Sequence, residues 1–343
     1  MPWICSDSPA LVLAPMEGVI DAPMRTLLTE RGGFSFCVSE FLRVHHQIYP
    51  RRVFEAHVPE LKQEGKTPSG VPVQVQLLGG NEEQMALNAF KAYEAGARAI
   101  DLNFGCPSPV VNRHDGGACL LKYPNRIQAI VSAVRKAVPH PIPVSAKLRL
   151  GWECMDDIFM NAERAMQGGA SWITIHARTK AQGYTPPAHW EYIGQVRKNL
   201  GIPIIANGEI WTLDDFKRCQ EITQCQHFMV GRGALANPDL AQQIAMEIGI
   251  LPQKTEKCFT LIHSPEYWEP ILHRFAQITE KSSFSSDYTT CRIKQWLKLA
   301  KLKNPLDYWF NALKLCKNSK ELFLALRKIS ENGSKSAFLD FRS

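Results

Sequence analysis

Eight short runs of β-branched and apolar residues recur through the first 250 residues of this 343-residue chain. Each run is followed by a turn signal and then by a stretch with helical periodicity, as in strand–helix units. The predicted strands are 11–14, 36–41, 73–78, 99–103, 143–148, 172–176, 202–206 and 227–230. The predicted helices include 82–95, 124–138, 156–167, 213–221 and 238–248. Eight such units predict a (β/α)8 barrel, whereas a doubly wound sheet would need fewer strands and a Gly-rich first turn, which is absent.

The remaining part of the chain has helical periodicity only and accounts for the net positive charge. Residues 251–343 contain 16 Lys and Arg against 9 Asp and Glu, so the whole net charge of +7 lies there. We therefore predict a catalytic barrel domain over 1–250 and a basic domain of about four helices over 251–343, beginning with an irregular linker at 251–269. A basic appendage on a neutral body fits the binding of a polyanion, and equally fits lysines that are only solvated.

Three details of this second domain are predicted from its pattern. An apolar stripe and a cationic stripe share one helix, formed by Ile293, Trp296, Leu297 and Ala300 and by Lys294, Lys298 and Lys301. Asn304-Pro305 is expected to cap a helix that carries Trp309, Leu313 and Cys316, and Asn332-Gly333 to end a further one. The segment 43–66 is too long for one helix and stays unassigned.

Composition excludes several classes of protein. With 45% hydrophobic and 21% charged residues the chain is typical of globular proteins. No stretch of eighteen residues lacks a charge, and the first residues lack a basic segment followed by an apolar one, so we expect neither a membrane span nor a secretory leader. The ten cysteines form no Cys-x-x-Cys pair, which argues against a disulfide scaffold and a metal site. A cytoplasmic monomer is the expectation.

Polar residues follow every predicted strand, where a barrel enzyme has its active site. They are Pro15-Met16-Glu17-Gly18, Glu40, Arg43, Gln76, Asn103-Phe104-Gly105-Cys106-Pro107, Lys147, Arg149, His176, Arg178, Asn207-Gly208-Glu209 and Gly231-Arg232-Gly233. A single Lys or His at a strand end is as often a structural residue as a functional one. Polar residues at all eight ends predict an active site.

The types of these residues indicate a bound flavin mononucleotide. Loops 207–209 and 231–233 combine glycine with a polar or basic side chain, as in the phosphate sites of barrels. Lys147 and His176 would place a cation in the barrel mouth, which suits a ring that becomes negative on reduction.

Cys106, between Gly105 and Pro107, is the candidate catalytic residue. A cysteine is often a buried core residue, but this one lies just past a strand end. Its ordinary pKa near 8.5 leaves it protonated at neutral pH, so it can act as a general acid without assistance. A nucleophilic role would require a nearby base, and neither a nucleophile elbow nor H-E-x-x-H is present.

Taken together, the motifs resemble those of the flavin-dependent tRNA-dihydrouridine synthases. The matching stretches are 14–18, 103–108, 116–118, 147–151, 176–179, 207–210 and 231–234, and they cover nearly the whole barrel in family order. Residues 207–211 and 292–297 resemble the bacterial C-type subfamily.

The resemblance implies reduction of the C5=C6 bond of a D-loop uridine in tRNA, at position 16 in the C type. FMN would be tightly bound and NADPH would supply the hydride; hydride would go to C6 while Cys106 protonates C5. The implied flavin contacts are Pro15, Met16, Glu17, Gln76, Lys147, His176, Asn207, Gly208, Glu209, Gly231 and Arg232. The implied tRNA contacts are Arg43, Asn103, Tyr184, Arg292 and Lys294. Since the target base is stacked in folded tRNA, it must be extruded into the barrel mouth.

Two alternatives remain at this point. The same barrel and flavin could reduce a free pyrimidine or another small molecule, although such a substrate needs no basic appendage. The chain could also be a non-catalytic tRNA-binding protein, against which the polar residues at all eight strand ends argue.

Overall fold

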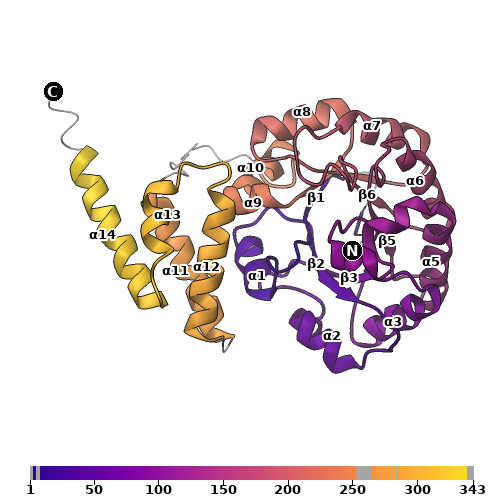
Figure 1. Cartoon of the computed structure of the whole chain (residues 1–343), viewed down its shortest axis with the longest axis horizontal. Helices are drawn as coiled ribbons and strands as arrows, with labels where there is room; N and C mark the ends of the chain where they lie inside the picture. Colours follow the sequence, from indigo (N-terminus) through magenta and orange to yellow (C-terminus); the bar gives the residue numbers. More distant parts are fainter. Residues whose placement is uncertain (1–2, 5–7, 253–263, 283, 338–343) are drawn as a thin grey trace.

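A closed barrel of eight parallel strands forms the larger part of the molecule (Figure 1). The computed structural model describes residues 3–4, 8–252, 264–282 and 284–337. The strands are β1 Ala10–Leu13, β2 Phe36–Arg43, β3 Val73–Leu78, β4 Ile100–Asn103, β5 Val144–Arg149, β6 Ile173–His176, β7 Ile204–Asn207 and β8 His227–Val230. Each strand pairs with the next, and β8 pairs with β1. The (β/α)8 prediction is confirmed, with strand bounds shifted by no more than two residues.

Helices surround the barrel and connect its strands. They are α1 Ala22–Glu30, α2 Arg51–His57, α3 Glu82–Glu94, α4 Pro109–Arg113, α5 Pro124–Ala137, α6 Asp157–Gln167, α7 Trp190–Asn199, α8 Leu213–Thr223, α9 Arg232–Ala236 and α10 Leu240–Glu247. Two short 3₁₀ segments, Pro59–Gln63 and Gly117–Lys122, are also present. The unassigned segment 43–66 contains α2 and the first of these 3₁₀ segments.

Side-chain caps fix where several helices begin. Asn81 accepts from the Gln84 amide at the start of α3, and Thr212 and Asp215 form a reciprocal capping box at the start of α8. These caps satisfy amides that have no partner within the helix.

Alternating side chains of the strands fill two different spaces. In β1, Leu11 and Leu13 belong to the large core beneath the helices, while Val12 belongs to a separate cluster that also includes Phe36 and Trp172. This alternation is the period of two expected of a strand. Near the carboxyl ends of the strands the barrel also contains buried polar residues, among them Gln76, His176 and Asn207.

Four further helices lie beside the barrel in Figure 1. They are α11 Pro265–Lys281, α12 Ser286–Ala300, α13 Asp307–Leu313 and α14 Ser319–Ala337. The predicted apolar stripe of α12 is buried in full. Arg274 of α11 forms a bidentate pair with Glu30 of α1, so these helices are tied to the barrel.

Three expectations about this region are wrong in detail. The irregular linker expected over 251–269 does not extend to residue 269, because α11 begins at Pro265; residues 253–263 of that prediction lie outside the described ranges. Asn304 does not cap a helix: its side-chain amide donates to the carbonyl groups of Ala236 (2.6 Å) and Ala300 (3.1 Å). The following helix runs from Asp307 to Leu313 and ends before Cys316.

The helix stop predicted at Asn332-Gly333 is also wrong, since α14 continues to Ala337. Glycine lowers helix stability by about 1 kcal/mol relative to alanine, which does not by itself end a helix.

Within the described residues, none of the helices has the length and hydrophobicity needed to cross a bilayer.

Candidate active site

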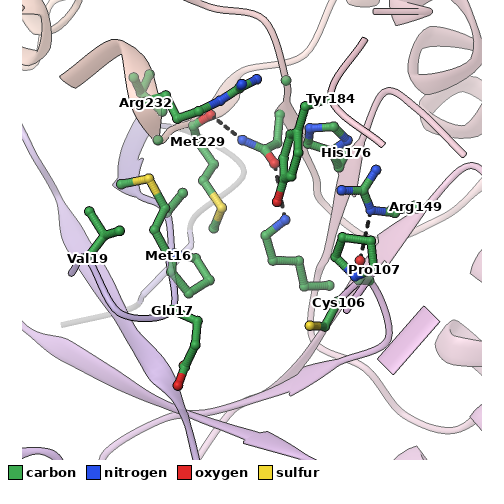
Figure 2. A pocket seen from close by; sticks show the side chains of 18 of the residues that line it. Met16, Glu17, Val19, Cys106, Pro107, Arg149, His176, Tyr184, Met229 and Arg232 are labelled. Carbon is green, nitrogen blue, oxygen red and sulfur yellow. Dashed lines mark hydrogen bonds between the residues drawn. The ribbon is translucent and has the colours of Figure 1, made fainter. Parts of the chain in front are cut away.

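A cavity of about 540 Å³ opens at the carboxyl ends of the strands (Figure 2). Its walls come from all eight strand ends or the loops that follow them, and from α12. Every residue predicted to contact the flavin lines it: Pro15, Met16, Glu17, Gln76, Lys147, His176, Asn207, Gly208, Glu209, Gly231 and Arg232. Asn103, Cys106 and Tyr184 line it as well. The structure therefore brings together residues that are separated by up to 217 positions, from Pro15 to Arg232.

Cys106 lies in a loop that is held by Asn103 at the end of β4. The Asn103 Oδ1 atom accepts hydrogen bonds from the backbone amides of Gly105 and Cys106, both at 2.9 Å. In Figure 2 the Cys106 sulfur points toward the side of the cavity on which Glu17 lies. Burial raises the pKa of the Cys106 thiol, and the Glu17 carboxyl adds to this effect. The thiol is therefore protonated at neutral pH and can donate a proton.

Lys147 provides a half-buried cation that lines the cavity. Its Nζ atom donates to Asn207 Oδ1 at 3.1 Å, and Asn207 Nδ2 in turn donates to the Met229 carbonyl at 2.8 Å. These bonds connect β5, β7 and β8. Burial lowers the pKa of Lys147, and the positive charge of Arg149 lowers it further.

His176 is neutral at physiological pH. Burial and the charges of Arg149 and Lys147 lower the pKa of His176 well below its ordinary value. Its Nδ1 atom is buried and has no hydrogen-bond partner among the described residues. A buried polar atom without a partner is uncommon in proteins. The His176 side chain itself lines the cavity.

Cations and aromatic rings alternate along one wall. Tyr184 lies between the guanidinium groups of Arg149 and Arg232, at 5.1 and 4.6 Å from its ring centre. The Trp211 ring centre lies 4.8 Å from the Arg232 guanidinium and 5.3 Å from the Lys303 ammonium. Lys303 follows α12 and belongs to the tail, by which we mean helices α11 to α14 and the turns between them. These contacts have cation–π geometry and connect the barrel mouth to the helical region.

The loops after β7 and β8 make room for a ligand through glycine. Gly208 has a φ of +117°, a conformation that favours glycine. A Cβ atom at Gly231 would lie 3.3 Å from both the Ala14 Cβ and the Met16 Sδ atoms, so a larger residue would crowd this part of the cavity. The carboxylate of Glu209, in the first loop, is bound by Arg178 and by the Trp211 indole N–H at 2.9 Å.

Two neighbouring carboxyl groups, Glu17 after β1 and Glu40 in β2, have raised pKa values. Burial and the neighbouring Glu40 raise the pKa of Glu17 to about 7. Burial also raises the pKa of Glu40, whose Oε1 atom accepts from the Val19 amide at 2.9 Å. Glu17 therefore exchanges protons near neutral pH.

Three of the residues expected to bind tRNA do not line the cavity. Arg43 donates to the Val110 carbonyl at 3.4 Å near the rim. Arg292 pairs with Asp21 at 3.0 Å, and Lys294 donates to the Cys316 carbonyl within the tail. In this conformation, then, Arg292 joins α12 to the barrel and the Lys294 ammonium is bound within the tail.

Other cavity residues were not expected to be there. Leu299 and Leu302 reach it from the end of α12, and Val19 and Phe41 line it from the first two units. No sequence signal identifies Leu299 and Leu302, because their place depends on how the tail packs against the barrel.

No group of three or more His, Cys, Asp or Glu side chains gathers as a metal site in the ranges that the structure describes.

Comparison with solved structures supports the fold. The chain is similar to a 2-naphthoyl-CoA reductase, with a TM-score of 0.54 and 12% identity over 69% of this chain and 50% of the other. It is also similar to histamine dehydrogenase from Rhizobium sp. 4-9, with a TM-score of 0.52 and 14% identity over 78% of this chain and 49% of the other. At these identities the likeness concerns the fold alone, and the chain spans about half of each of these proteins.

Sequence comparison identifies the family. A protein from Shewanella oneidensis named tRNA-dihydrouridine(16) synthase is 44% identical over 321 residues, covering 93% of this chain and 97% of that protein. The protein of the same name from Haemophilus influenzae is also 44% identical, covering 93% and 99%. The Neisseria meningitidis protein is 42% identical, covering 91% and 92%. The family model for dihydrouridine synthases matches residues 12–332 of this chain, and the chain belongs to that family.

Proposed function

We propose that this oxidoreductase reduces the C5=C6 bond of uridine 16 in the D-loop of tRNA, with FMN in the cavity and NADPH as the hydride source. The reaction class is that of the family, and position 16 follows the names of the relatives. Within the family we assign the chain to the C-type subfamily, on the stretches 207–211 and 292–297. Because tRNA is the substrate, we place the reaction in the cytoplasm.

The single observation that carries the proposal is the convergence of Cys106, Lys147, His176 and Arg232 on one cavity. The residues fit FMN by their chemistry. Met16 and Met229 supply apolar walls for a ring, while Lys147 supplies a cation. Glycines 208 and 231 leave space near Arg232, which suits a phosphate, and the His176 imidazole lines the cavity and offers one more polar contact.

When bound, FMN supplies hydride transfer to C6 of the uracil ring. The residues of the chain perform the other tasks. Cys106 carries the proton for C5 on a thiol whose pKa is raised by burial, so the donor is loaded at neutral pH. Lys147, held by Asn207, offers positive charge to a ring that gains electrons.

Tyr184 and its flanking arginines suit the nucleotide that enters the cavity. The tyrosine ring is exposed and is held by cation–π contacts from both sides. An extruded base can stack on such a ring, and the arginines can contact the neighbouring phosphates. Asn103 lines the cavity and Arg43 lies near its rim, so both would contact the tRNA beside the extruded nucleotide.

We assign catalysis to residues 1–250 and tRNA binding to residues 251–343. Exposed cations of the tail, among them Lys298 and Lys317, would bind phosphates with a strong dependence on salt. Arg292 and Lys294 would take part once the tRNA competes for their present partners.

The test uses purified protein, NADPH and unmodified tRNA. We expect yellow protein and NADPH oxidation that accelerates when the tRNA is added. Yellow protein whose rate of NADPH oxidation is unchanged by tRNA would favour a small-molecule substrate. Colourless protein that binds tRNA would favour a non-catalytic role.

A further inference from the structure

A buried series of hydrogen bonds connects Asp101 in β4 to the Cys106 loop. Gln76 Nε2 donates to Asp101 Oδ2 at 2.6 Å, and Asn103 Nδ2 donates to Gln76 Oε1 at 2.8 Å. The Asn103 Oδ1 atom then accepts from the amides of Gly105 and Cys106 at 2.9 Å. We refer to Asp101, Gln76 and Asn103 as the relay.

The hydrogen-bonding groups at the two ends of the relay determine how the Gln76 and Asn103 side-chain amides are oriented. The Asp101 carboxylate only accepts, so Gln76 must present its NH₂ group to it. The backbone amides of Gly105 and Cys106 only donate, so Asn103 must present its oxygen to them. The Gln76 oxygen and the Asn103 NH₂ group are then left facing each other, as the structure has them. A single orientation of each amide satisfies both ends.

Asp101 is fixed independently of the loop. It is 1% exposed, and Ser145 donates to its other oxygen while accepting from Gln74 Nε2 at 2.9 Å. Burial raises the pKa of Asp101, but the hydrogen bonds from Ser145 and Gln76 and the charge of Lys147 oppose this. Asp101 does not line the cavity, so it has no direct contact with a substrate there.

We propose that Asp101 is a positioning residue for Cys106: by anchoring the Gln76 amide it fixes Asn103, and Asn103 fixes the loop that aims the thiol. That the position of the Cys106 thiol matters for activity rests on the proposed function, in which Cys106 donates a proton to a flipped base. The hydrogen bonding of the loop does not depend on that function, so it can be tested separately.

The test measures hydrogen–deuterium exchange of the Gly105 and Cys106 amides in the purified flavin-loaded protein, together with kcat and KM for tRNA. Asp101→Leu keeps the branched shape of the side chain, with larger methyl groups in place of the oxygens, and cannot accept a hydrogen bond. We expect exchange of these two amides to accelerate about tenfold or more, since each roughly 1.4 kcal/mol of lost protection gives a factor of ten. We expect kcat to fall at least about tenfold, with KM for tRNA nearly unchanged, because a misplaced catalytic group slows the chemical step.

Two matched variants separate anchoring from general stability. Ser145→Ala removes another buried hydrogen bond to Asp101 but leaves the relay complete. Asp101→Asn removes the charge but keeps an oxygen that can accept from Gln76. Both should leave exchange at Gly105 and Cys106 within about threefold of the wild-type rate, as expected of bonds outside the loop.

Exchange that stays slow in Asp101→Leu would overturn the proposal, as would exchange that accelerates equally throughout β4 and β5. If Asp101→Leu does not fold, Asp101→Ala replaces it, with the same expected result and the same contrary one. Loss of amide protection in an enzyme inactive on tRNA would instead support the relay and contradict the proposed function.

Discussion

The indole N–H of Trp296 in α12 donates a hydrogen bond to the main-chain carbonyl of Leu235 in α9, at 2.9 Å. Helix α9 begins at Arg232, which lines the cavity, so this bond ties the helical tail to a part of the chain that also forms the active site. The Trp296 ring is buried and packs edge-on against Trp268 at 5.4 Å between ring centres.

Replacing this tryptophan should weaken the attachment of the tail. Trp296→Phe keeps an aromatic ring but leaves the Leu235 carbonyl without its donor. We expect the free energy of unfolding to fall by about 1–3 kcal/mol, the cost of an unsatisfied buried polar group. Chemical denaturation measures this loss. An unchanged unfolding midpoint would show that the bond contributes nothing to the attachment.

Cys106→Ala should separate flavin binding from uridine reduction. The side chain is lost from a loop whose backbone is held by Asn103, so we expect the cavity and the flavin absorbance to remain. We expect kcat for dihydrouridine formation to fall about 100-fold or more, the usual contribution of a general acid. Mass spectrometry of the digested tRNA measures the product. Cys119→Ala, at a half-buried thiol outside the cavity, is the control and should keep full activity.

The ion pair between Arg25 and Glu60 lies in the core beneath α1. The two side chains are 0% and 4% exposed and form two bonds of 2.8 Å. Glu60→Gln leaves a buried guanidinium without a counter-charge, so we expect a loss of about 3 kcal/mol in the free energy of unfolding. Glu55→Gln breaks the pairs with Arg51 and Lys62, whose side chains are 66% and 63% exposed, and should change the free energy of unfolding by less than about 1 kcal/mol. Equal effects of the two substitutions would contradict this difference.

His227 in β8 should make the protein sensitive to acid. Burial lowers the pKa of His227 to about 4 from an ordinary value of 6.5. Between these values the unfolded chain binds the proton and the folded protein does not, so stability is complete above pH 6.5 and decreases as the pH falls toward 4.

We therefore expect this residue alone to lower the free energy of unfolding by about 2 kcal/mol between pH 7 and pH 5. The glutamine of His227→Gln does not titrate, so the free energy of unfolding of this variant should fall correspondingly less between pH 7 and pH 5. Urea denaturation at the two pH values measures the difference, and equal losses in both proteins would contradict the assignment.

The sequence predicts the barrel well because its signals are local. The run 73–78 coincides with β3 and 227–230 with β8, since short apolar runs bounded by turn signals leave few alternatives. The strand ends then predict the cavity, because parallel strands of a barrel deliver their next residues to one rim. This is why the sequence alone groups residues as distant as Glu17 and Arg232, both of which line the cavity.

What could not be predicted depends on tertiary packing. Asn304 has the sequence pattern of a cap, but its amide instead satisfies the Ala236 carbonyl at the end of α9, a partner known only once the tail is placed. For the same reason Leu302 enters the cavity without any signal of its own. Arg292 and Lys294 were expected to contact tRNA, yet in the structure they bind Asp21 and the Cys316 carbonyl.

Locating dihydrouridine in tRNA after reaction tests the proposed function and the role of Cys106 together. Unmodified tRNA is incubated with the purified enzyme and NADPH, and the position of the modified base is mapped by mass spectrometry of ribonuclease fragments. We predict dihydrouridine at position 16 with wild-type protein and almost none with Cys106→Ala. Product at position 16 formed equally well by both proteins, or no product in tRNA at all, would contradict the proposed mechanism.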